Sequence, residues 1–204
     1  MSFFSKFFGR KKEEQNVEDE EYIVANFNDK VMPFDRGEVY EDPLDEFLKS
    51  EGIGEVSGGG TMQLETGEIE YCDVEIKLNP NQSGDDKIEL IIAKLEDLGA
   101  PKGSFITIEK TSRKIELGKR EGIGIYLDGV NLGDDVYQNN DSNFVVSEVK
   151  RLINDNSEAV RYWEAEKETG LYFYADSFIA IEASIQGFLS EYPLCKNARV
   201  EQIA

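Results

Sequence analysis

The sequence predicts an α+β protein made of two tandem copies of one small unit. Two collinear sets of matching residues, roughly 100 positions apart, indicate a duplication of domain size. Each half then shows strand and helix periodicities in the same order. The chain has 204 residues, of which 40% are hydrophobic and 11% aromatic, so two small packed cores are possible.

The first set of matches is the pattern ETG, three residues, Tyr, one residue, Asp, two residues, Ile. It occurs at residues 65–76 and again at residues 168–179. The second set is Val-Tyr with a Phe further along, at residues 39–47 and 136–144. Both sets keep their spacing and their order, which is difficult to attribute to chance.

The matches divide the chain into three parts: a tail over 1–22, a first unit over 23–112 and a second unit over 113–204. In the first unit, Asp42 before Pro43 is a typical helix start, and the glycines after each apolar stripe are typical helix ends. Alternating apolar and polar residues indicate the strands. The expected order is strands at 23–27 and 30–34, a helix at 42–51, strands at 55–64 and 68–78, a helix at 85–98 and a strand at 104–109.

The second unit follows the same order. A helix is expected to begin at Asp141 or Ser142, where a side chain can cap the first turn. The expected elements are a strand at 122–127, a helix from 142, strands at 160–166 and 171–175, a helix at 177–191 and a strand at 198–203. Both units therefore have the βαββαβ order of a ferredoxin-like unit, with helices on one face of an antiparallel sheet.

The charge of the chain is strongly acidic, with 22 basic residues, 42 acidic residues and a formal net charge of −20. Binding to a phosphate backbone requires Lys and Arg to displace counterions, so we expect no nucleic-acid partner. An acidic surface favours solubility and can steer a basic partner toward the protein.

Histidine is absent, and the only cysteines are Cys72 and Cys195. This removes Ser-His and Cys-His catalytic pairs, the commonest metal ligand and any disulfide framework. We therefore expect a protein that is not an enzyme and holds no cofactor or metal. Cys72 shares a strand face with Val74 and should be buried and inert. Cys195 lies in a predicted turn, where exposure is possible, but nothing near it in the sequence makes it a credible nucleophile.

Three consecutive glycines at 58–60, followed by Thr61, superficially suggest a phosphate-binding loop. Such a loop requires a helix directly after the glycines, and here a strand is expected. The sequence therefore favours a β-bulge or a close backbone approach at this position.

The tail combines a basic, aromatic start with an acidic continuation. Phe3, Phe4, Phe7 and Phe8 would share one face of a short helix, and residues 1–12 carry basic but no acidic side chains. This favours weak contact with a membrane surface. The alternative is a tail whose phenylalanines pack elsewhere. With no secretory signal and no apolar run of about 20 residues, we expect a cytoplasmic protein that can be peripheral at the inner face of the membrane.

Aromatic side chains on the predicted sheets provide the candidate partner-binding surface. If the helices cover the faces that carry Cys72 and Phe173, the opposite faces are left open, and they present residues that protein interfaces favour. These candidates are Ile69, Tyr71, Tyr162, Trp163, Tyr172 and Tyr174. The alternative is that the two units pack on each other through the same residues, because a duplicated chain must bury its repeat interface somewhere.

Several segments together resemble a group of small acidic bacterial proteins. They are SGGGT at 57–61, EIEYCDVEI at 68–76, LGAPKGS at 98–104, IYLDG at 125–129, YWE at 162–164, LYFY at 171–174 and YPLC at 192–195. The set resembles immunity proteins encoded beside bacterial polymorphic or contact-dependent toxins, or uncharacterised relatives of those proteins. The resemblance covers most of the chain after residue 39 and implies a cytosolic inhibitor that masks a toxin domain. The phenylalanine-rich start is not part of that pattern.

The expected function is therefore non-catalytic binding of a protein partner, with a basic toxin domain as the implied partner. The alternative is a small-molecule or regulatory sensor, which a polar pocket between the two units would favour. An enzyme acting through carboxylates, Tyr or Lys would require a cleft that holds a group with a strongly shifted pKa.

Overall fold

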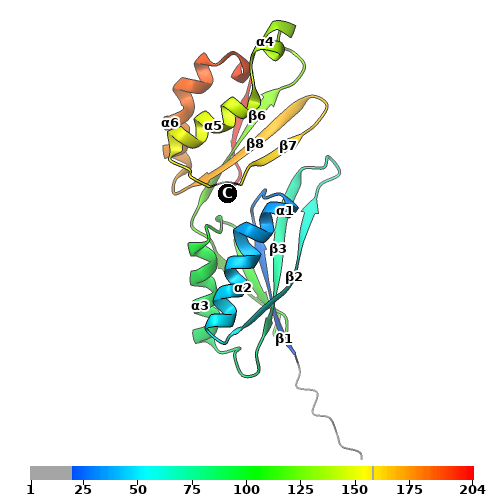
Figure 1. Cartoon of the computed structure of the whole chain (residues 1–204), viewed down its shortest axis with the longest axis vertical. Helices are drawn as coiled ribbons and strands as arrows, with labels where there is room; N and C mark the ends of the chain where they lie inside the picture. The colour runs from blue at the N-terminus through cyan, green and yellow to red at the C-terminus, as the bar shows by residue number, and fades with distance from the viewer. Residues whose placement is uncertain (1–19, 158) are drawn as a thin grey trace, which may run out of the picture.

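The computed structural model describes residues 20–157 and 159–204. Over these residues the protein is a mixed α+β structure with two antiparallel sheets, one of five strands and one of four. The two sheets belong to two units that follow each other along the long axis of the molecule (Figure 1). No helix in this part of the chain is long and apolar enough to cross a membrane.

The first unit contains the five-stranded sheet, in the order β2-β3-β1-β4-β5. Its helices α2 and α3 lie on one face of this sheet (Figure 1). Its elements are β1 (Glu21–Phe27), α1 (Pro33–Arg36), η1 (Gly37–Glu41), α2 (Asp42–Ser50), β2 (Gly54–Gln63), β3 (Ile69–Leu78), α3 (Asp85–Asp97), β4 (Ser104–Ile108) and β5 (Arg113–Leu117).

The second unit contains the four-stranded sheet, in the order β7-β8-β6-β9. Helices α5 and α6 cover one face of it (Figure 1). Its elements are β6 (Glu121–Asp128), α4 (Asp134–Asn139), α5 (Ser142–Ile153), β7 (Arg161–Glu164), β8 (Glu168–Ala175), α6 (Phe178–Glu191), η2 (Pro193–Cys195) and β9 (Arg199–Gln202).

The two cores form where the alternation of each central strand meets the apolar stripe of a helix. In β3, Cys72, Val74 and Ile76 are buried together with Ile91 and Leu95 of α3. Burying one such aliphatic side chain stabilises the fold by about 1.5–3 kcal/mol. The predicted face of β3 is therefore confirmed, and so is the predicted burial of Cys72.

The second core is built in the same way. Leu171 and Phe173 of β8 pack against Val149 of α5 and Ile185 of α6. Helix α5 starts where its capping residue predicts, because the Asp141 side chain accepts a hydrogen bond from the backbone N–H of Asn143 at 2.8 Å.

The boundary between the units differs from the predicted one at 112/113. Strand β5 pairs with β4 and belongs to the first sheet, with Leu117 buried in the first core. The change of unit therefore falls at residues 118–120, between β5 and β6. A short strand with alternating polarity does not show in its sequence which of two neighbouring sheets it will join.

The predicted strand at 30–34 is also wrong. Pro33 opens a helical run that continues through η1 and α2, so the helical segment begins before Asp42. Proline suits the first helical position because its missing N–H would have no partner there. The segment between β1 and Pro33 is instead a loop that reaches the second unit.

The glycines of β2 form the predicted irregularity. The register of β2 against β3 shifts between Val56 and Gly58. A side chain at Gly59 would place its Cβ 2.7 Å from the carbonyl oxygen of Asp73. The bulge and the close backbone approach are both present, and no helix follows the glycines.

The two sets of repeated residues differ in how well the structure matches them. The Val-Tyr and Phe positions fall in corresponding helical segments, η1 and α2 in the first unit and α4 and α5 in the second. The last positions of the ETG pattern do not correspond in the structure. Ile76 is a core residue of β3, whereas Ile179 lies on α6 and is 76% exposed.

Candidate binding site at the junction of the two units

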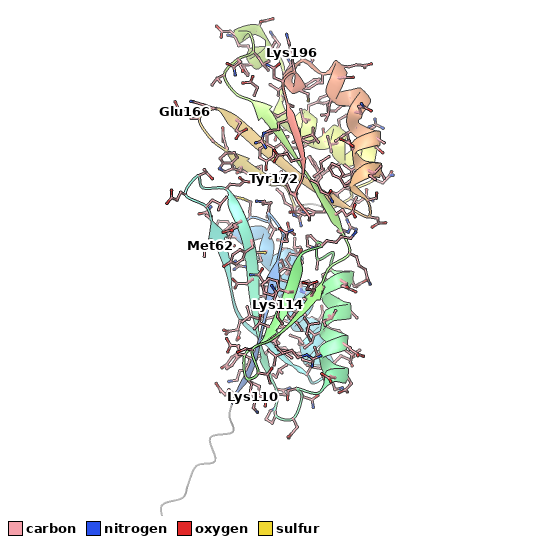
Figure 2. All side chains as sticks on the ribbon, turned by 180° about the vertical axis from the view of Figure 1, so that it is seen from behind. Met62, Lys110, Lys114, Glu166, Tyr172 and Lys196 are labelled. Atoms are coloured by element: carbon pink, nitrogen blue, oxygen red, sulfur yellow. The ribbon has the colours of Figure 1, made fainter. Side chains whose placement is uncertain are left out.

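The face of the second sheet that the helices leave open meets the end of the first unit. Tyr126 of β6 and Tyr172 and Tyr174 of β8 form a buried cluster there, with Trp163 and Ile203 packed against it. Tyr172 lies at the boundary between the units (Figure 2). The phenols therefore contact loops of the first unit and not solvent.

The centre of the junction is an ion pair between Asp29, in the loop after β1, and Arg161 of β7. The guanidinium donates two hydrogen bonds to the carboxylate, at 2.6 and 3.0 Å. Tyr40 adds a third, from its hydroxyl to Asp29 Oδ2 at 2.7 Å. Burial disfavours the Arg161 cation, but Asp29 outweighs this and raises the pKa of Arg161. Because only 1% of Asp29 is exposed, water cannot solvate its carboxylate, and each of the two charges is stabilised mainly by the other.

Glu68 forms a second connection across the junction. Its carboxylate accepts hydrogen bonds from the hydroxyls of Tyr172, at 2.8 Å, and Tyr126, at 3.3 Å. Lys30 Nζ lies 3.1 Å from the same oxygen and completes the charge balance. Burial raises the pKa of Tyr126 to about 12 and raises that of Tyr172 as well, so both phenols stay protonated and act as donors.

Backbone groups of the first unit take part in the junction too. The Tyr174 hydroxyl accepts a hydrogen bond from the backbone N–H of Lys30 at 3.1 Å. The indole N–H of Trp163 donates to the carbonyl of Thr66 at 3.0 Å. In the reverse direction, the side-chain amide of Asn28 in the first unit donates to the backbone carbonyl of Ile203 in the second unit at 3.1 Å. The two units are thus joined by directed polar contacts as well as by apolar packing.

The six predicted partner-binding residues do not form one open surface. Tyr172 and Tyr174 are buried in the junction, and Ile69 is buried in the first unit beside it. The alternative, that the units pack on each other through these tyrosines, describes the structure better. The tyrosines contact loops and a hairpin end of the first unit, however, and not the face of its sheet. The physical reason is that a two-unit chain can cover an apolar sheet face with its own second half.

The other three predicted residues stay partly accessible but point in different directions. Tyr71 and Trp163 are half-buried, and Tyr162 is 43% exposed. Tyr162 pairs with Leu171, a core residue, whereas Trp163 pairs with Gly170 on the junction side of the sheet. These two neighbours therefore lie on opposite faces of β7.

Two hairpin ends lie side by side at one edge of the junction, as the Trp163–Thr66 hydrogen bond requires. Figure 2 shows Met62 and Glu166 along this edge. We define the hairpin rim as the exposed apolar side chains and the exposed glutamates near the turns of these two hairpins, and none of these glutamates forms an ion pair within residues 20–157 and 159–204. Its members are Met62, Leu64, Tyr162, Glu65, Glu70, Glu164 and Glu166. Tyr162 belongs to the rim from the face of β7 opposite to Trp163, and Lys167 is an exposed cation of the turn between β7 and β8.

A cavity of about 370 Å³ lies on another side of the junction and takes its lining from both units. Its lining is largely polar, as the sensor alternative requires. The lining residues with polar side chains are Asp97, Arg120, Asn154, Asp155, Asn156, Ser157, Arg161 and Tyr174. A neighbouring cavity of about 390 Å³ also takes its lining from both units, from Asp35, Glu38 and Val39 of the first and Ser157 and Ala159 of the second, but it offers no cationic side chain.

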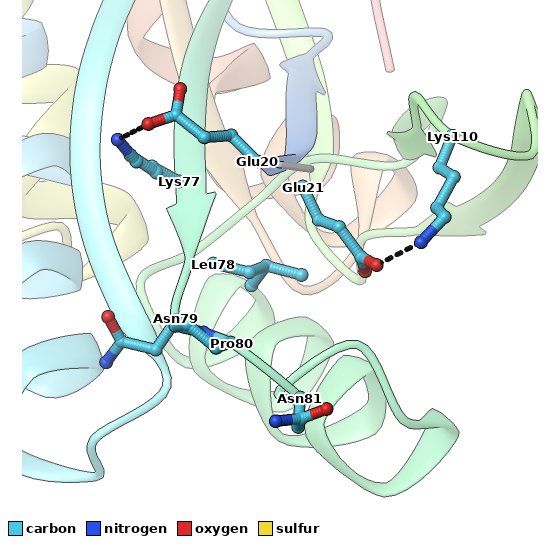
Figure 3. A pocket seen from close by; sticks show the side chains of 8 residues that line it. All are labelled: Glu20, Glu21, Lys77, Leu78, Asn79, Pro80, Asn81 and Lys110. Atoms are coloured by element: carbon cyan, nitrogen blue, oxygen red, sulfur yellow. Dashed lines mark hydrogen bonds and ion pairs between the residues drawn. The ribbon is translucent and has the colours of Figure 1, made fainter. Parts of the chain in front are cut away.

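A second cavity, of about 440 Å³, lies at the far end of the first unit. Figure 3 shows that its two carboxylates are already paired, Glu20 with Lys77 and Glu21 with Lys110. The hydrogen bond from Lys77 lowers the pKa of Glu20. Because these charges are neutralised by lysines, the cavity offers little unsatisfied charge to a ligand.

Neither cysteine is a reactive group. Burial raises the pKa of the Cys72 thiol well above its usual range. Cys195 does not take the exposed position that its turn-like sequence allows, since it is 5% exposed and burial raises its pKa to about 11. The turn η2 that carries Cys195 packs it into the second core, which the turn-like sequence does not reveal.

Phe3, Phe4, Phe7 and Phe8, the predicted membrane-contact residues, lie outside the described residues. Sequence reasoning missed the charged residues of the junction, namely Asp29, Lys30, Glu68 and Arg161. One signal could have found Arg161: it alternates with Trp163 and therefore shares its sheet face.

No family model matches the chain, and no curated protein is significantly similar to it. Among solved structures, an unknown protein from Galdieria sulphuraria is 14% identical over 90% of this chain and 96% of that chain, with a TM-score of 0.29. The first two RRM domains of yeast poly(U) binding protein (Pub1) are 12% identical over 89% of this chain and 99% of that chain, with a TM-score of 0.24. At these TM-scores neither similarity carries an inference about fold or binding.

Proposed function

We propose that this chain is a non-catalytic binding protein that holds a basic protein partner at the hairpin rim. The observation that carries the proposal is the composition of the two hairpin ends, which carry three exposed apolar side chains and four exposed glutamates against one exposed lysine, Lys167. Protein interfaces combine an apolar centre with a polar border, and complementary charge speeds association. The net charge of −20 extends the attraction for a basic partner over the whole molecule.

We also propose that each unit is a copy of a ferredoxin-like βαββαβ unit. The support is the strand order, in which the third strand of each unit lies between its second and first strands, and its fourth strand lies outside the first. Strand β5 is then an addition at the edge of the first copy. The shared helical positions of the Val-Tyr and Phe matches agree with this duplication.

For the partner, we propose the toxin domain of a bacterial toxin–immunity pair, which the resemblance to immunity proteins suggests. A basic nuclease-like surface would be attracted to the glutamates and covered by the rim. Exposed charge pairs contribute more to the rate of such an association than to its affinity, so salt should slow it strongly.

The experiment is co-purification from the native host at low and at moderate salt. The test variant reverses the four glutamates of the rim to lysine. A control variant carries the same number of charge reversals on exposed glutamates away from the rim, at Glu46, Glu51, Glu89 and Glu116.

We expect a basic protein to co-purify with the wild type and with the control, to be released as salt rises, and to be lost with the rim variant. Equal loss in both variants would show that only net charge matters and would contradict binding at the rim. The absence of any protein partner at either salt concentration would contradict the proposed function itself.

A further inference from the structure

The cavity between the units has a negative side made of two carboxylates, and one of them, Asp155, accepts a hydrogen bond from the backbone N–H of Ser157 at 2.9 Å and interacts electrostatically with the nearby Lys150 cation. Asp97 lies at the end of α3 and Asp155 just beyond the end of α5, and both line the cavity. Neither carboxylate forms an ion pair with a residue of the described ranges. Helices α3 and α5 also end here, and a helix C-terminus carries a partial negative charge. This side of the cavity favours an ammonium group.

The positive side of the cavity is Arg120, in the segment that links the units. One guanidinium nitrogen donates to the carbonyl of Tyr174 in the second unit at 3.1 Å. The backbone carbonyl of Arg120 accepts a hydrogen bond from the backbone N–H of Lys102 at 2.8 Å, which holds the Arg120 backbone against the first unit. No carboxylate of the described residues forms an ion pair with Arg120, so its other donors can bind an anion in the forked geometry that guanidinium offers.

Arg161, the other arginine of the lining, is in a different state, because Asp29 already occupies its guanidinium. The amide side chains of Asn154 and Asn156 and the hydroxyl of Ser157 add neutral donors and acceptors. Lys150 holds this segment in place by donating to the carbonyls of Ser157 and Ala159, at 2.9 and 2.8 Å.

We propose that this cavity binds a small zwitterion of the class of free α-amino acids. The ligand's carboxylate pairs with Arg120, and its ammonium group lies between Asp97, Asp155 and the ends of the two helices. A simple anion would meet the carboxylates of Asp97 and Asp155, and a simple cation would meet Arg120. A volume of about 370 Å³ is in the range of small-ligand pockets. This proposal concerns a different site from the hairpin rim and does not depend on it.

The test is isothermal titration calorimetry of the full chain at pH 7 against a panel of free L-amino acids. Each amino acid is compared with its decarboxylated amine and with its N-acetyl derivative, which lack the carboxylate and the ammonium group respectively. We expect saturable binding of at least one amino acid and about tenfold or greater weakening when either charge is removed. No saturable binding up to about 10 mM of any panel member would overturn the proposal.

Two variants assign the charges to residues. Arg120→Gln and Asp97→Asn should each weaken binding about tenfold or more, since each removes one ionic partner. Lys119→Gln is the matched control, because this neighbour of Arg120 is exposed and paired with Glu96 outside the cavity lining. Wild-type affinity in Arg120→Gln would overturn the proposal. Because Arg120 and Asp97 are exposed, both variants should fold, and circular dichroism checks this. The comparison of each amino acid with its two derivatives uses only the wild-type protein, so it tests the proposal even if a variant fails to fold.

Discussion

Arg161 and Asp29 are 132 residues apart in the sequence, yet their side chains form a two-bond ion pair that joins the two units. Arg161 comes from β7 of the second unit and Asp29 from the loop after β1 of the first. Both side chains are removed from water, so each charge relies on the other for its solvation. The arrangement of the units therefore depends on a specific contact as well as on general apolar packing.

Replacing Arg161 by alanine should destabilise the protein strongly. The change leaves the Asp29 carboxylate buried with only Tyr40 as a side-chain donor, and removing one partner of a buried pair costs about 3–5 kcal/mol. The control is Arg151→Ala, which breaks a solvent-exposed pair with Glu148 and should change the free energy of unfolding far less. Urea unfolding at pH 7 measures both. Equal costs would contradict the role given to the junction pair.

Tyr172→Phe should lower the free energy of unfolding by about 1–3 kcal/mol. The ring stays in the buried cluster, but Glu68 loses the 2.8 Å hydrogen bond from the hydroxyl. Tyr162→Phe is the matched control, because Tyr162 is exposed and its hydroxyl forms no hydrogen bond with described residues. A thermal unfolding series compares the two variants, and an unchanged midpoint for Tyr172→Phe would contradict the contact.

The elements that the sequence predicts well are those whose signals are local. The alternation around Cys72 and Val74 identifies the core face of β3, and Asp141 marks the start of α5 through its own hydrogen bond. The strand expected at 30–34 fails because the alternation there competes with Pro33, which begins a helix. A local pattern therefore predicts the type of an element correctly only where no stronger local signal opposes it.

The junction could be predicted only in part, since its contacts are long-range. Sequence alternation places Tyr172 and Tyr174 correctly on the face away from the helices. It does not show that the loop at Asp29 and the hairpin end at Glu68 cover this face, because these contacts link residues more than 100 positions apart. For the same reason the charged residues that satisfy the buried phenols were not identified.

Asp128 gives the protein a defined sensitivity to acid. Its carboxylate accepts hydrogen bonds from the backbone N–H groups of Val130 and Asn131, both at 3.0 Å, and these lower its pKa to about 2. Because the pKa of this carboxyl is lower in the folded protein, its ionised form stabilises the fold at pH values above the unfolded-state pKa of about 3.9. This contribution is lost as the pH falls through the pKa of the folded state.

We therefore expect the stability difference between wild type and Asp128→Asn to be constant above pH 5 and to shrink between about pH 4 and pH 2. Urea unfolding across this range measures it. Asp176→Asn is the control, because Asp176 is exposed and forms no hydrogen bond with described residues. A stability difference that does not change with pH would contradict the assignment.

Both cysteines should resist thiol reagents in the folded protein. Cys72 is fully buried, and burial raises the pKa of both thiols, so little thiolate is present at pH 8. We expect labelling by a thiol-reactive chromophore to be negligible in buffer and complete for both residues in urea. Rapid labelling of Cys195 in buffer would show that η2 opens readily.

Site-specific photocrosslinking tests the binding function at the hairpin rim most directly. A photoreactive amino acid replaces Leu64 of the rim in one variant and Leu90 of α3 in another, and these side chains are equally accessible at 42% and 41% exposure. After irradiation in the native host, we predict a crosslink to a basic protein from position 64 and none from position 90. No crosslink from position 64, or the same products from both positions, would contradict partner binding at the rim.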